Sequence, residues 1–392
     1  MQETHEQTGR LASVDVLRGA TMAAMIVVNN PGSWRAMYQA LRHAAWGAPP
    51  APADLIFPTF IFLVGVSVPL ALGRRLTAGS PRPDLLRHAL RRGLVLLLIG
   101  VGLNLFPDFD LATVRLPGVL QRIAVVYVAC VLAFMAWGPR GRLVAAIALL
   151  AGYTALLGWA PVPGVGRPLV SPEMSWPVWL DERLLGAHAW RGPGDPEGVL
   201  STLPAIASGL MGTLAGGWLR AGGPPERAAR RLAALGLALA AAGHLWSLRL
   251  PAVKELWTGS YALITAGWAL LALAVCLRLI DGLGWRRGLS PLKLLGRRAL
   301  TAFVAAHLIS DVAILVVRWS DGAGGTISLH HFVRRHLFDG WLSPEAASLA
   351  QSLGLLAVIV ATLAVMRRRD RPRRLTGHAP AAKLETRREN HA

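Results

Sequence analysis

The chain has little cysteine and lacks the common motifs of soluble enzymes. Among its 392 residues only Cys130 and Cys276 are cysteines, and both fall inside apolar stretches, which excludes a disulfide framework and a cysteine-based metal site. We find no Walker loop, no dinucleotide-binding glycine fingerprint and no Gly-x-Ser-x-Gly elbow. His330, His331 and His336 lack zinc-helix spacing, so we expect solvated loop histidines and no bound metal. The polar start of the chain also lacks the pattern of a cleaved signal peptide.

Apolar residues, in contrast, are abundant. The chain is 53% hydrophobic with a mean hydropathy of +0.44. Its apolar runs reach the roughly 20 residues that cross a bilayer, and such long runs favour helices over barrel strands. We therefore expect an all-α, polytopic membrane protein with about ten transmembrane helices. The expected spans are about 12–30, 54–73, 88–106, 117–137, 143–160, 198–219, 229–248, 256–279, 299–317 and 345–366.

The formal net charge of +19 suggests nucleic acid at first sight, but the placement of the charges excludes that class of partner. Lys and Arg gather in alternate loops, with 28 on one side of the expected membrane and 11 on the other. Short loops rich in Lys and Arg stay in the cytoplasm. We therefore expect both termini in the cytoplasm and the odd-numbered loops outside.

The chain reads as one transmembrane domain, 1–366, followed by a disordered basic cytoplasmic tail, 367–392, that rests on anionic lipid. The two halves show no self-similarity, so the inverted repeat of many transporters is not indicated. Two outer loops, 161–197 and 318–344, are unusually long for a compact domain. Loops of this length are usually functional.

An imidazole and a carboxylate, His43 and Asp54, lie at the outer mouth of the second expected span. Polar groups are expensive in hydrocarbon, so titratable side chains at such a junction indicate function. The alternative is structural: His43 would anchor the chain at the interface, and Asp54 would cap the second helix.

Five short sequence blocks occur in order between residues 11 and 320. They are 13–19 with 28–29, 43–46 with 53–58, 116–122, 180–186 with 195–198, and 256–261. Together they resemble the transmembrane catalytic region of the heparan-alpha-glucosaminide N-acetyltransferase family, which includes the lysosomal enzyme and bacterial relatives. The resemblance implies an acetyl-CoA-dependent N-acetyltransferase of the bacterial inner membrane that passes acetyl to a glucosamine amine on the far side. It also suggests a homodimer.

The resemblance assigns the family's active-site histidine to His43 and its span-ending asparagine to Asn29. A neutral imidazole can attack a thioester or take the proton of an attacking amine. Asp54 would hold the imidazole tautomer. Asn29 would stabilise the oxyanion of the thioester, or equally satisfy a neighbouring helix backbone.

A second set of residues is expected to bind the acceptor. Arg122 lies inside the fourth span and therefore needs an anionic partner, either Asp54, Asp195, Glu197 or a substrate group; a structural ion pair is the alternative. Loop 161–197 mixes tryptophans with carboxylates, which suits a cationic amino sugar, although an aromatic belt at headgroup level would look the same. The acceptor-binding candidates are Arg122, Asp181, Asp195, Glu197 and Trp257.

Arg18, Arg297 and Arg298 are candidates for the phosphates of CoA, because guanidinium suits phosphate and all three lie at the cytoplasmic side. Asp15 is three residues before Arg18, so an ion pair that locks the helix entry is the alternative for Arg18. Other arginines on this side serve as topology signals.

We therefore expect a membrane acetyltransferase whose partners are acetyl-CoA as donor, an amino sugar or glycan as acceptor, and membrane lipid. The rival is a transporter or non-enzymatic scaffold in which His43, Asp54 and Arg122 form a proton-coupled or structural network. Donor binding separates the two, since a transporter has no need of CoA.

Overall fold

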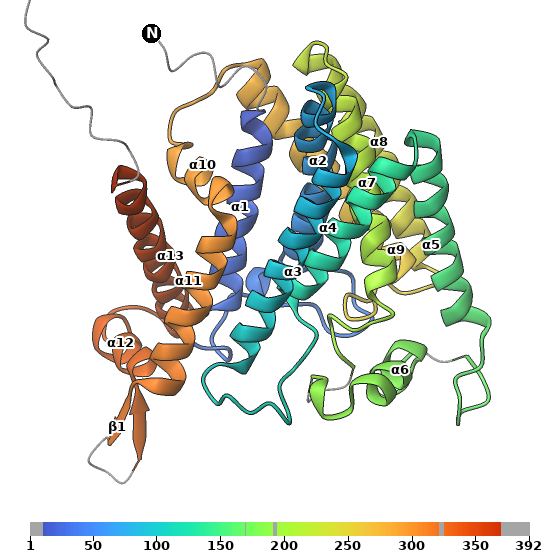
Figure 1. The fold of residues 1–392 in the computed structure, drawn as a ribbon. Coiled ribbons are helices and arrows are strands. Elements are labelled where there is room, and N and C mark those ends of the chain that lie inside the picture. The colour runs from blue at the N-terminus through green and yellow to red at the C-terminus, as the bar shows by residue number, and fades with distance from the viewer. Residues whose placement is uncertain (1–10, 169, 191–193, 321–324, 370–392) are drawn as a thin grey trace, which may run out of the picture.

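The computed structural model describes residues 11–168, 170–190, 194–320 and 325–369, and the chain is mostly helical (Figure 1). Short 3-10 helices cover Gln39–Leu41, Pro52–Leu55 and Gly186–His188. Two segments, Leu277–Gly282 and Val312–Val316, continue α9 and α11 as π-helix. The α-helices of the described chain are α1 (Ala12–Asn29), α2 (Ile56–Thr77), α3 (Arg82–Leu105), α4 (Val119–Ala136), α5 (Pro139–Trp159), α6 (Trp176–Leu185), α7 (Thr202–Arg220), α8 (Pro225–Ser247), α9 (Gly259–Cys276), α10 (Ser290–Arg297), α11 (Ala299–Asp311), α12 (Leu329–Leu337) and α13 (Pro344–Arg369).

Eight helical segments in the described residues are long and apolar enough to cross a bilayer, namely those built on α1, α2, α3, α4, α5, α9, α11 and α13. This confirms the prediction of a helical membrane protein. The expected sixth and seventh spans correspond to α7 and α8, which have 19 and 23 residues but are not among the eight. Glycine, serine and threonine lower the hydropathy of α7, and Arg227, Arg230 and Arg231 lower that of α8. The count of ten spans stays a prediction.

The long helices stand side by side and give the bundle two distinct ends (Figure 1). We call the end where α1 begins and α13 finishes the basic end, because the arginine-rich turns between helices lie there. We call the opposite end the loop end. It holds the segments 30–55, 106–118 and 160–201, together with α12 and a small hairpin.

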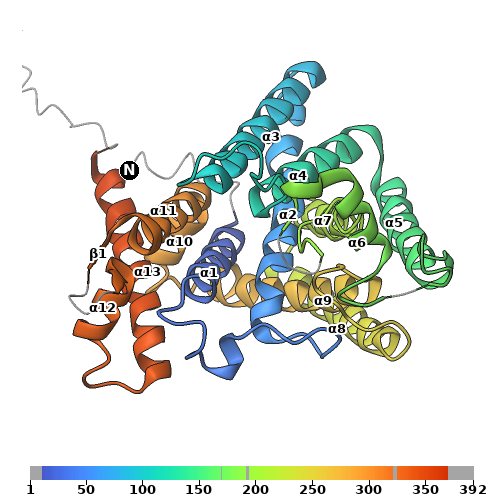
Figure 2. The ribbon, with the colours of Figure 1, turned by 90° about the horizontal axis from the view of Figure 1, so that it is seen from below.

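Glycines allow the central helices to approach closely. A Cβ atom on Gly65 of α2 would overlap the carbonyl of Gly209, and one on Gly212 of α7 would overlap that of Phe62. The helices therefore touch backbone to backbone, and Phe62 and its neighbours are fully buried between them. Seen from the loop end, α2 and α1 lie between a group formed by α5, α8 and α9 and a second group formed by α11, α12 and α13 (Figure 2).

Close approach at glycines also joins α1 to α10. The sequence-based prediction placed the residues of α10 in a loop between two spans. A Cβ atom on Gly19 would overlap the carbonyl oxygen of Leu292, and one on Gly296 would overlap that of Asp15. Gly19 belongs to the sequence block 13–19, whereas Gly296 lies in none of the five blocks. Their role in the fold is to bring the start of α1 against the end of α10.

The two long loops contain regular structure. Loop 161–197 holds α6, and loop 318–344 holds the antiparallel strands β1 (Arg318–Ser320) and β2 (Thr326–Ser328), with Trp319 opposite Ile327, followed by α12. The last helix α13 continues to Arg369, three residues beyond the predicted end of the membrane domain. The remainder of the predicted tail, 370–392, lies outside the described residues.

Candidate active site

The structure brings His43 and Asp54 into direct contact at the loop end. Asp54 lies in the 3-10 helix Pro52–Leu55, whose starting proline needs no N–H partner there. Its Oδ2 accepts the backbone N–H groups of Ala44 at 3.0 Å and Ala51 at 2.9 Å. Its Oδ1 lies 2.7 Å from Nδ1 of His43. The carboxylate therefore joins the His43 segment to the start of α2.

The two members of this pair differ in exposure. The side chain of Asp54 is 2% exposed and that of His43 is 36% exposed. An ionised Asp54 accepts the Nδ1 proton of His43, which leaves the lone pair of Nε2 available on the exposed side of the ring. This is the arrangement that a base or nucleophile requires.

Two residues that the sequence reading missed also contact Asp54. Nζ of Lys254 lies 3.4 Å from Oδ1, and the buried hydroxyl of Tyr261 donates to the backbone oxygen of Asp54 at 2.7 Å. Composition offered a signal for the lysine, because only three of the 41 basic residues are lysines and Lys254 lies two residues before the block 256–261. Tyr261 belongs to that block but was not predicted to be a site residue.

Trp257, predicted to bind the acceptor, is buried behind the pair. Its ring meets Phe57 and Tyr261 edge-on at centroid distances of 5.7 and 5.6 Å, and its Nε1 donates to the hydroxyl of Ser208 at 3.1 Å. Its φ of +51° is unusual for a bulky side chain and persists only where packing enforces it. In this arrangement Trp257 supports the site from within and is not open to a sugar.

Arg122 is also buried, with 2% of its surface exposed. Its Nη2 donates to the carbonyl of Gly198 and to the hydroxyl of Ser201, and its guanidinium lies 5.1 Å above the ring of Trp257. Within the described residues no carboxylate lies within 4 Å of it, so the expected ion pair is absent here and a substrate anion remains as the predicted partner. The stacked ring provides part of the compensation for its charge.

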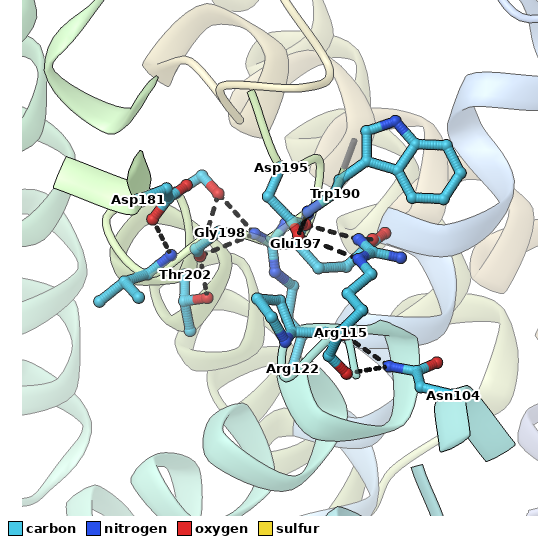
Figure 3. A network of polar contacts seen from close by, with 12 residues as sticks. Asn104, Arg115, Arg122, Asp181, Trp190, Asp195, Glu197, Gly198 and Thr202 are labelled. Carbon is cyan, nitrogen blue, oxygen red and sulfur yellow. Dashed lines mark hydrogen bonds and ion pairs between the residues drawn. The ribbon is translucent and has the colours of Figure 1, made fainter. Parts of the chain in front are cut away.

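The predicted acidic residues of loop 161–197 are engaged by Arg115, which the sequence reading had counted only as an outer-loop charge. Nε of Arg115 donates to Asp195 at 2.9 Å, and Nη2 donates to Asp195 and to Glu197, the latter at 2.6 Å (Figure 3). The ring of Trp190 covers the guanidinium at 5.0 Å. Burial alone would lower the pKa of Arg115, but the two carboxylates raise it instead. Asn104 holds the Arg115 carbonyl at 2.7 Å.

Asp181 is buried beside this cluster (Figure 3). One oxygen accepts the N–H of Val199 at 2.9 Å, and the other has no hydrogen-bond partner among the described residues. Burial raises the pKa of Asp181 to about 6; the Val199 bond opposes the change and the charge of Asp195 adds to it. Asp181 therefore acts in the fold as the anchor of α6 to the start of α7.

Asn29, the third predicted catalytic residue, ends α1 on the loop side and is exposed. It makes no polar contact with His43 or Asp54. Its neighbour Asn30 forms the interhelical bonds, accepting from Ser310 of α11 at 2.6 Å and from Ser352 of α13 at 2.9 Å. The structure therefore does not bring Asn29 to the His43–Asp54 pair.

The predicted donor-binding arginines line one cavity of about 880 Å³ that enters from the basic end. Its mouth is cationic, and its inner wall is apolar and formed by side chains of α1, α2, α4 and α11. The basic lining residues are Arg18, Arg74, Arg75, His88, Arg92, Arg297 and Arg298, and the apolar ones include Met22, Met25, Phe60, Leu120, Ile123 and Phe303.

Arg18 forms the ion pair considered as the alternative for it, and it also lines the cavity. Nη1 lies 3.3 Å from Asp15, which is the predicted ion pair, and Nη2 donates to Ser67 at 2.6 Å, while the side chain lines the cavity. Arg297 approaches the other oxygen of Asp15 at 3.4 Å. The close approach of α1 and α10 at their glycines places these groups together.

The predicted residues thus fall into two groups. Arg18, Arg297 and Arg298 surround the cavity at the basic end, whereas His43 and Asp54 lie at the loop end and do not line it. The guanidinium of Arg122 lies over the ring of Trp257, and Trp257 meets Tyr261 edge-on. These contacts connect the His43–Asp54 pair with the loop 161–197 cluster.

Known proteins show similarity to this chain. A mouse (Mus musculus) protein named heparan-alpha-glucosaminide N-acetyltransferase is 29% identical over 257 residues, which cover 53% of this chain and 38% of the mouse protein. A human (Homo sapiens) protein of the same name is 28% identical over 363 residues, covering 77% of this chain and 53% of the human one. The chain thus spans about half or less of these relatives. The family model described as heparan-alpha-glucosaminide N-acetyltransferase, catalytic, matches residues 10–169, and it confirms that this helical membrane protein resembles the transferases of that family.

Proposed function

We propose that the protein is a membrane acetyltransferase that takes acetyl from acetyl-CoA at the basic end and delivers it to an amino sugar at the loop end. The observation that carries the proposal is the contact of the half-exposed His43 with the buried Asp54. The similarity to named acetyltransferases supports it. This chain spans only about half or less of those relatives, so we propose the donor, the acceptor and the membrane orientation for this chain in their own right.

The chemistry that we propose is transfer of an acyl group between a thiol and an amine. Nε2 of His43 takes one proton from the acceptor ammonium, and the amine nitrogen then bonds to the thioester carbonyl carbon as the carbon–sulfur bond breaks. The second proton of the nitrogen goes to the departing sulfur, so that CoA leaves as the thiol. In the covalent variant, Nε2 itself bonds to the carbonyl carbon first and the amine then displaces the imidazole. In both variants Asp54 stabilises the positive imidazole ring.

The cavity at the basic end suits the donor. Guanidinium groups at its mouth match the phosphates of CoA, and the apolar inner wall matches the pantetheine arm. Phe60 on that wall follows Asp54 by six residues, about 9 Å at the rise of an α-helix. The acetyl group must therefore cross a layer of side chains near Phe57 and Trp257 to reach His43, and we assign that step to a movement on donor binding.

The basic end faces the cytoplasm in this proposal, which is the side that holds acetyl-CoA. The excess of Lys and Arg at this end supports that orientation, and both chain termini then face inward, as predicted for a bacterial inner-membrane protein. With α7 and α8 counted as spans, ten helices cross the bilayer.

The acceptor approaches from the loop end. Because Arg115 occupies Asp195 and Glu197, we propose that this cluster shapes the acceptor entrance and that exposed faces such as that of Trp190 meet the sugar.

The experiment uses the purified full chain in detergent. Acetyl-CoA should raise the melting temperature, and labelled acetyl should pass from acetyl-CoA to glucosamine. His43→Ala should keep donor binding and lower the transfer rate by roughly 100-fold or more, the usual effect of losing a general base. His244→Ala changes an exposed histidine of α8 and should leave the rate unchanged.

The same assay separates the rival functions. With no acceptor present, only the covalent variant leaves labelled acetyl on the protein and releases CoA in equal amount. A protein that shows neither donor binding nor transfer is a transporter or a scaffold, and transfer by His43→Ala at the normal rate removes the catalytic assignment.

A further inference from the structure

Lys254 shares one carboxylate oxygen with His43. The loop between α8 and α9 places its ammonium 3.4 Å from Oδ1 of Asp54, the oxygen that also bonds Nδ1 of His43 at 2.7 Å. The other oxygen, Oδ2, is occupied by the N–H groups of Ala44 and Ala51. Every contact site of the carboxylate is therefore assigned, and the only permanent cation among its contacts in the described chain is Lys254.

The burial of Asp54 makes this cation necessary. A carboxylate that is 2% exposed is expensive to ionise unless a cation and hydrogen bonds compensate it. His43 cannot supply that charge while its ring is neutral, which is the form that acts as base or nucleophile. The ammonium of Lys254, which is 26% exposed and lies 3.4 Å from Oδ1, can supply it.

The charged groups around this site are few. Glu255 lines the same small cavity as Asp54, Lys254 and Tyr261. Arg42 is turned away, because it donates to the backbone oxygens of Met37 and Arg35. The charged side chains that line this small cavity with Asp54 are therefore Lys254 and Glu255. Arg122 and Glu197 act on Tyr261 from farther away.

The backbone fixes the position of Lys254. The N–H of Trp257 donates to the Lys254 carbonyl at 3.0 Å, and the N–H of Val253 donates to the Thr258 hydroxyl at 3.1 Å. The left-handed conformation of Trp257 closes this turn and is enforced by the burial of its ring. These contacts fix the irregular loop and thereby hold the side chain of Lys254 in one position.

We infer that Lys254 is a positioning residue: its ammonium keeps Asp54 ionised and turned toward His43, so that Nδ1 of His43 stays protonated and Nε2 stays free. The inference rests on the proposed function, because the proposed acetyl transfer is the reaction in which the free Nε2 acts. It adds a third member, remote in sequence, to the His43–Asp54 pair.

The first test measures His43 without measuring activity. Diethylpyrocarbonate modifies only the neutral imidazole, so the pH midpoint of His43 modification, followed on its peptide by mass spectrometry, reports the titration of this ring. Lys254→Met removes a positive charge and leaves the negative charge of Asp54 uncompensated. Both changes favour the protonated imidazole, and the midpoint should rise by about 0.5 unit or more.

Two further variants control this result. Lys254→Arg keeps the charge and should restore most of the normal midpoint. Arg249→Met removes an exposed cation of the same loop that does not contact Asp54, and its midpoint should match that of the unaltered protein. A Lys254→Met protein that melts normally and shows an unchanged midpoint overturns the inference.

The second test uses the transfer reaction. Lys254→Met should lower kcat for acetyl transfer about 10- to 100-fold with little change in KM for acetyl-CoA, since Lys254 does not line the donor cavity. Adding Lys254→Met to His43→Ala should lower kcat no further, because both substitutions act through the imidazole of His43. Full additivity of the two losses contradicts the inference.

Failure of the proposed function remains distinguishable. If the unaltered protein transfers no acetyl but Lys254→Met still shifts the His43 midpoint, the acetyltransferase proposal fails while the positioning role of Lys254 stands. If transfer occurs and Lys254→Met changes neither midpoint nor kcat, only the positioning role fails.

Discussion

Three buried carboxylates at the loop end differ in how their charge is compensated. Asp54 receives two backbone N–H groups, an imidazole and an ammonium, and Asp195 receives the fork of Arg115. Among the described residues, Asp181 receives only the N–H of Val199. Burial without a bonded cation is why the pKa of Asp181 rises to about 6.

Asp181 should therefore make stability depend on pH. An unfolded Asp titrates near pH 4, so between about pH 4 and 6 the folded state binds more protons than the unfolded state, and the free energy of unfolding falls as pH rises. A raised pKa of about 6 corresponds to a loss of about 3 kcal/mol across this interval. In detergent, the melting temperature of Asp181→Asn should not show this decrease between about pH 4 and 6. The exposed neighbour Glu182→Gln should keep it, and equal pH slopes for Asp181→Asn and the unaltered protein would refute this account.

At the scale of elements, the contact of α1 with α10 shapes the cavity at the basic end, where we propose that the donor binds. Asp15 and Arg18 pair within α1, and Arg297 of α10 reaches the same carboxylate because the helices touch at Gly19 and Gly296. Any side chain at either glycine must push the helices apart.

Gly19→Ala should lower both the melting temperature and the affinity for acetyl-CoA, since the added methyl group meets the Leu292 carbonyl. The matched control is Gly354→Ala in the middle of α13, where open space surrounds the new Cβ. That change should be neutral or stabilise the helix by up to about 1 kcal/mol. Thermal melts with and without acetyl-CoA measure both effects, and equal behaviour of the two variants would disprove the close-approach explanation.

Loop 161–197 depends on Arg115 in a comparable way. Removing this guanidinium leaves Asp195 buried and without a cation, which typically destabilises by about 3–5 kcal/mol. Arg115→Met should therefore lower the melting temperature and make the loop more sensitive to proteolysis. Arg183→Met, which removes an exposed arginine stacked on Trp179, should do neither. Normal protease resistance of Arg115→Met would show that the loop is held by other contacts.

At the scale of the whole molecule, orientation in the membrane is the property to test. In a Cys276→Ala background, a cysteine at the exposed Trp34 of the loop end should react with an impermeant thiol reagent added to intact cells. A cysteine at Arg286, at the basic end, should react only after the membrane is disrupted. The reverse pattern would place His43 on the cytoplasmic side and overturn the proposed direction of transfer.

The long apolar helices could be predicted from sequence because hydropathy is a local property. The contact of His43 with Asp54 could be anticipated too, since only ten residues separate them and the resemblance to a family points to both. The boundaries were less accurate: α3 starts at Arg82, six residues before the expected 88, because a helix continues into charged surroundings beyond the apolar run.

Contacts across the chain could not be predicted. Lys254 lies 200 residues from Asp54, and Arg115 lies 80 residues from Asp195, so no local period connects them. Arg122 was expected to pair with an acid, but a carbonyl, a hydroxyl and the face of Trp257 receive it instead. A sequence indicates that a buried cation needs compensation, but it does not indicate which groups provide it.

The inner wall of the donor cavity, at Met25 and Phe60, has a consequence for the energy metabolism of the cell. Because the cavity does not extend to His43 in the described structure, it opens no continuous water-filled path between the two ends of the bundle. An acetyl group that crosses by exchange between bonded partners needs no such path. In the proposed transfer, the molecule exports a chemical group while the membrane around it retains its proton gradient, and vesicles that contain it should hold a pH difference as long as vesicles of lipid alone.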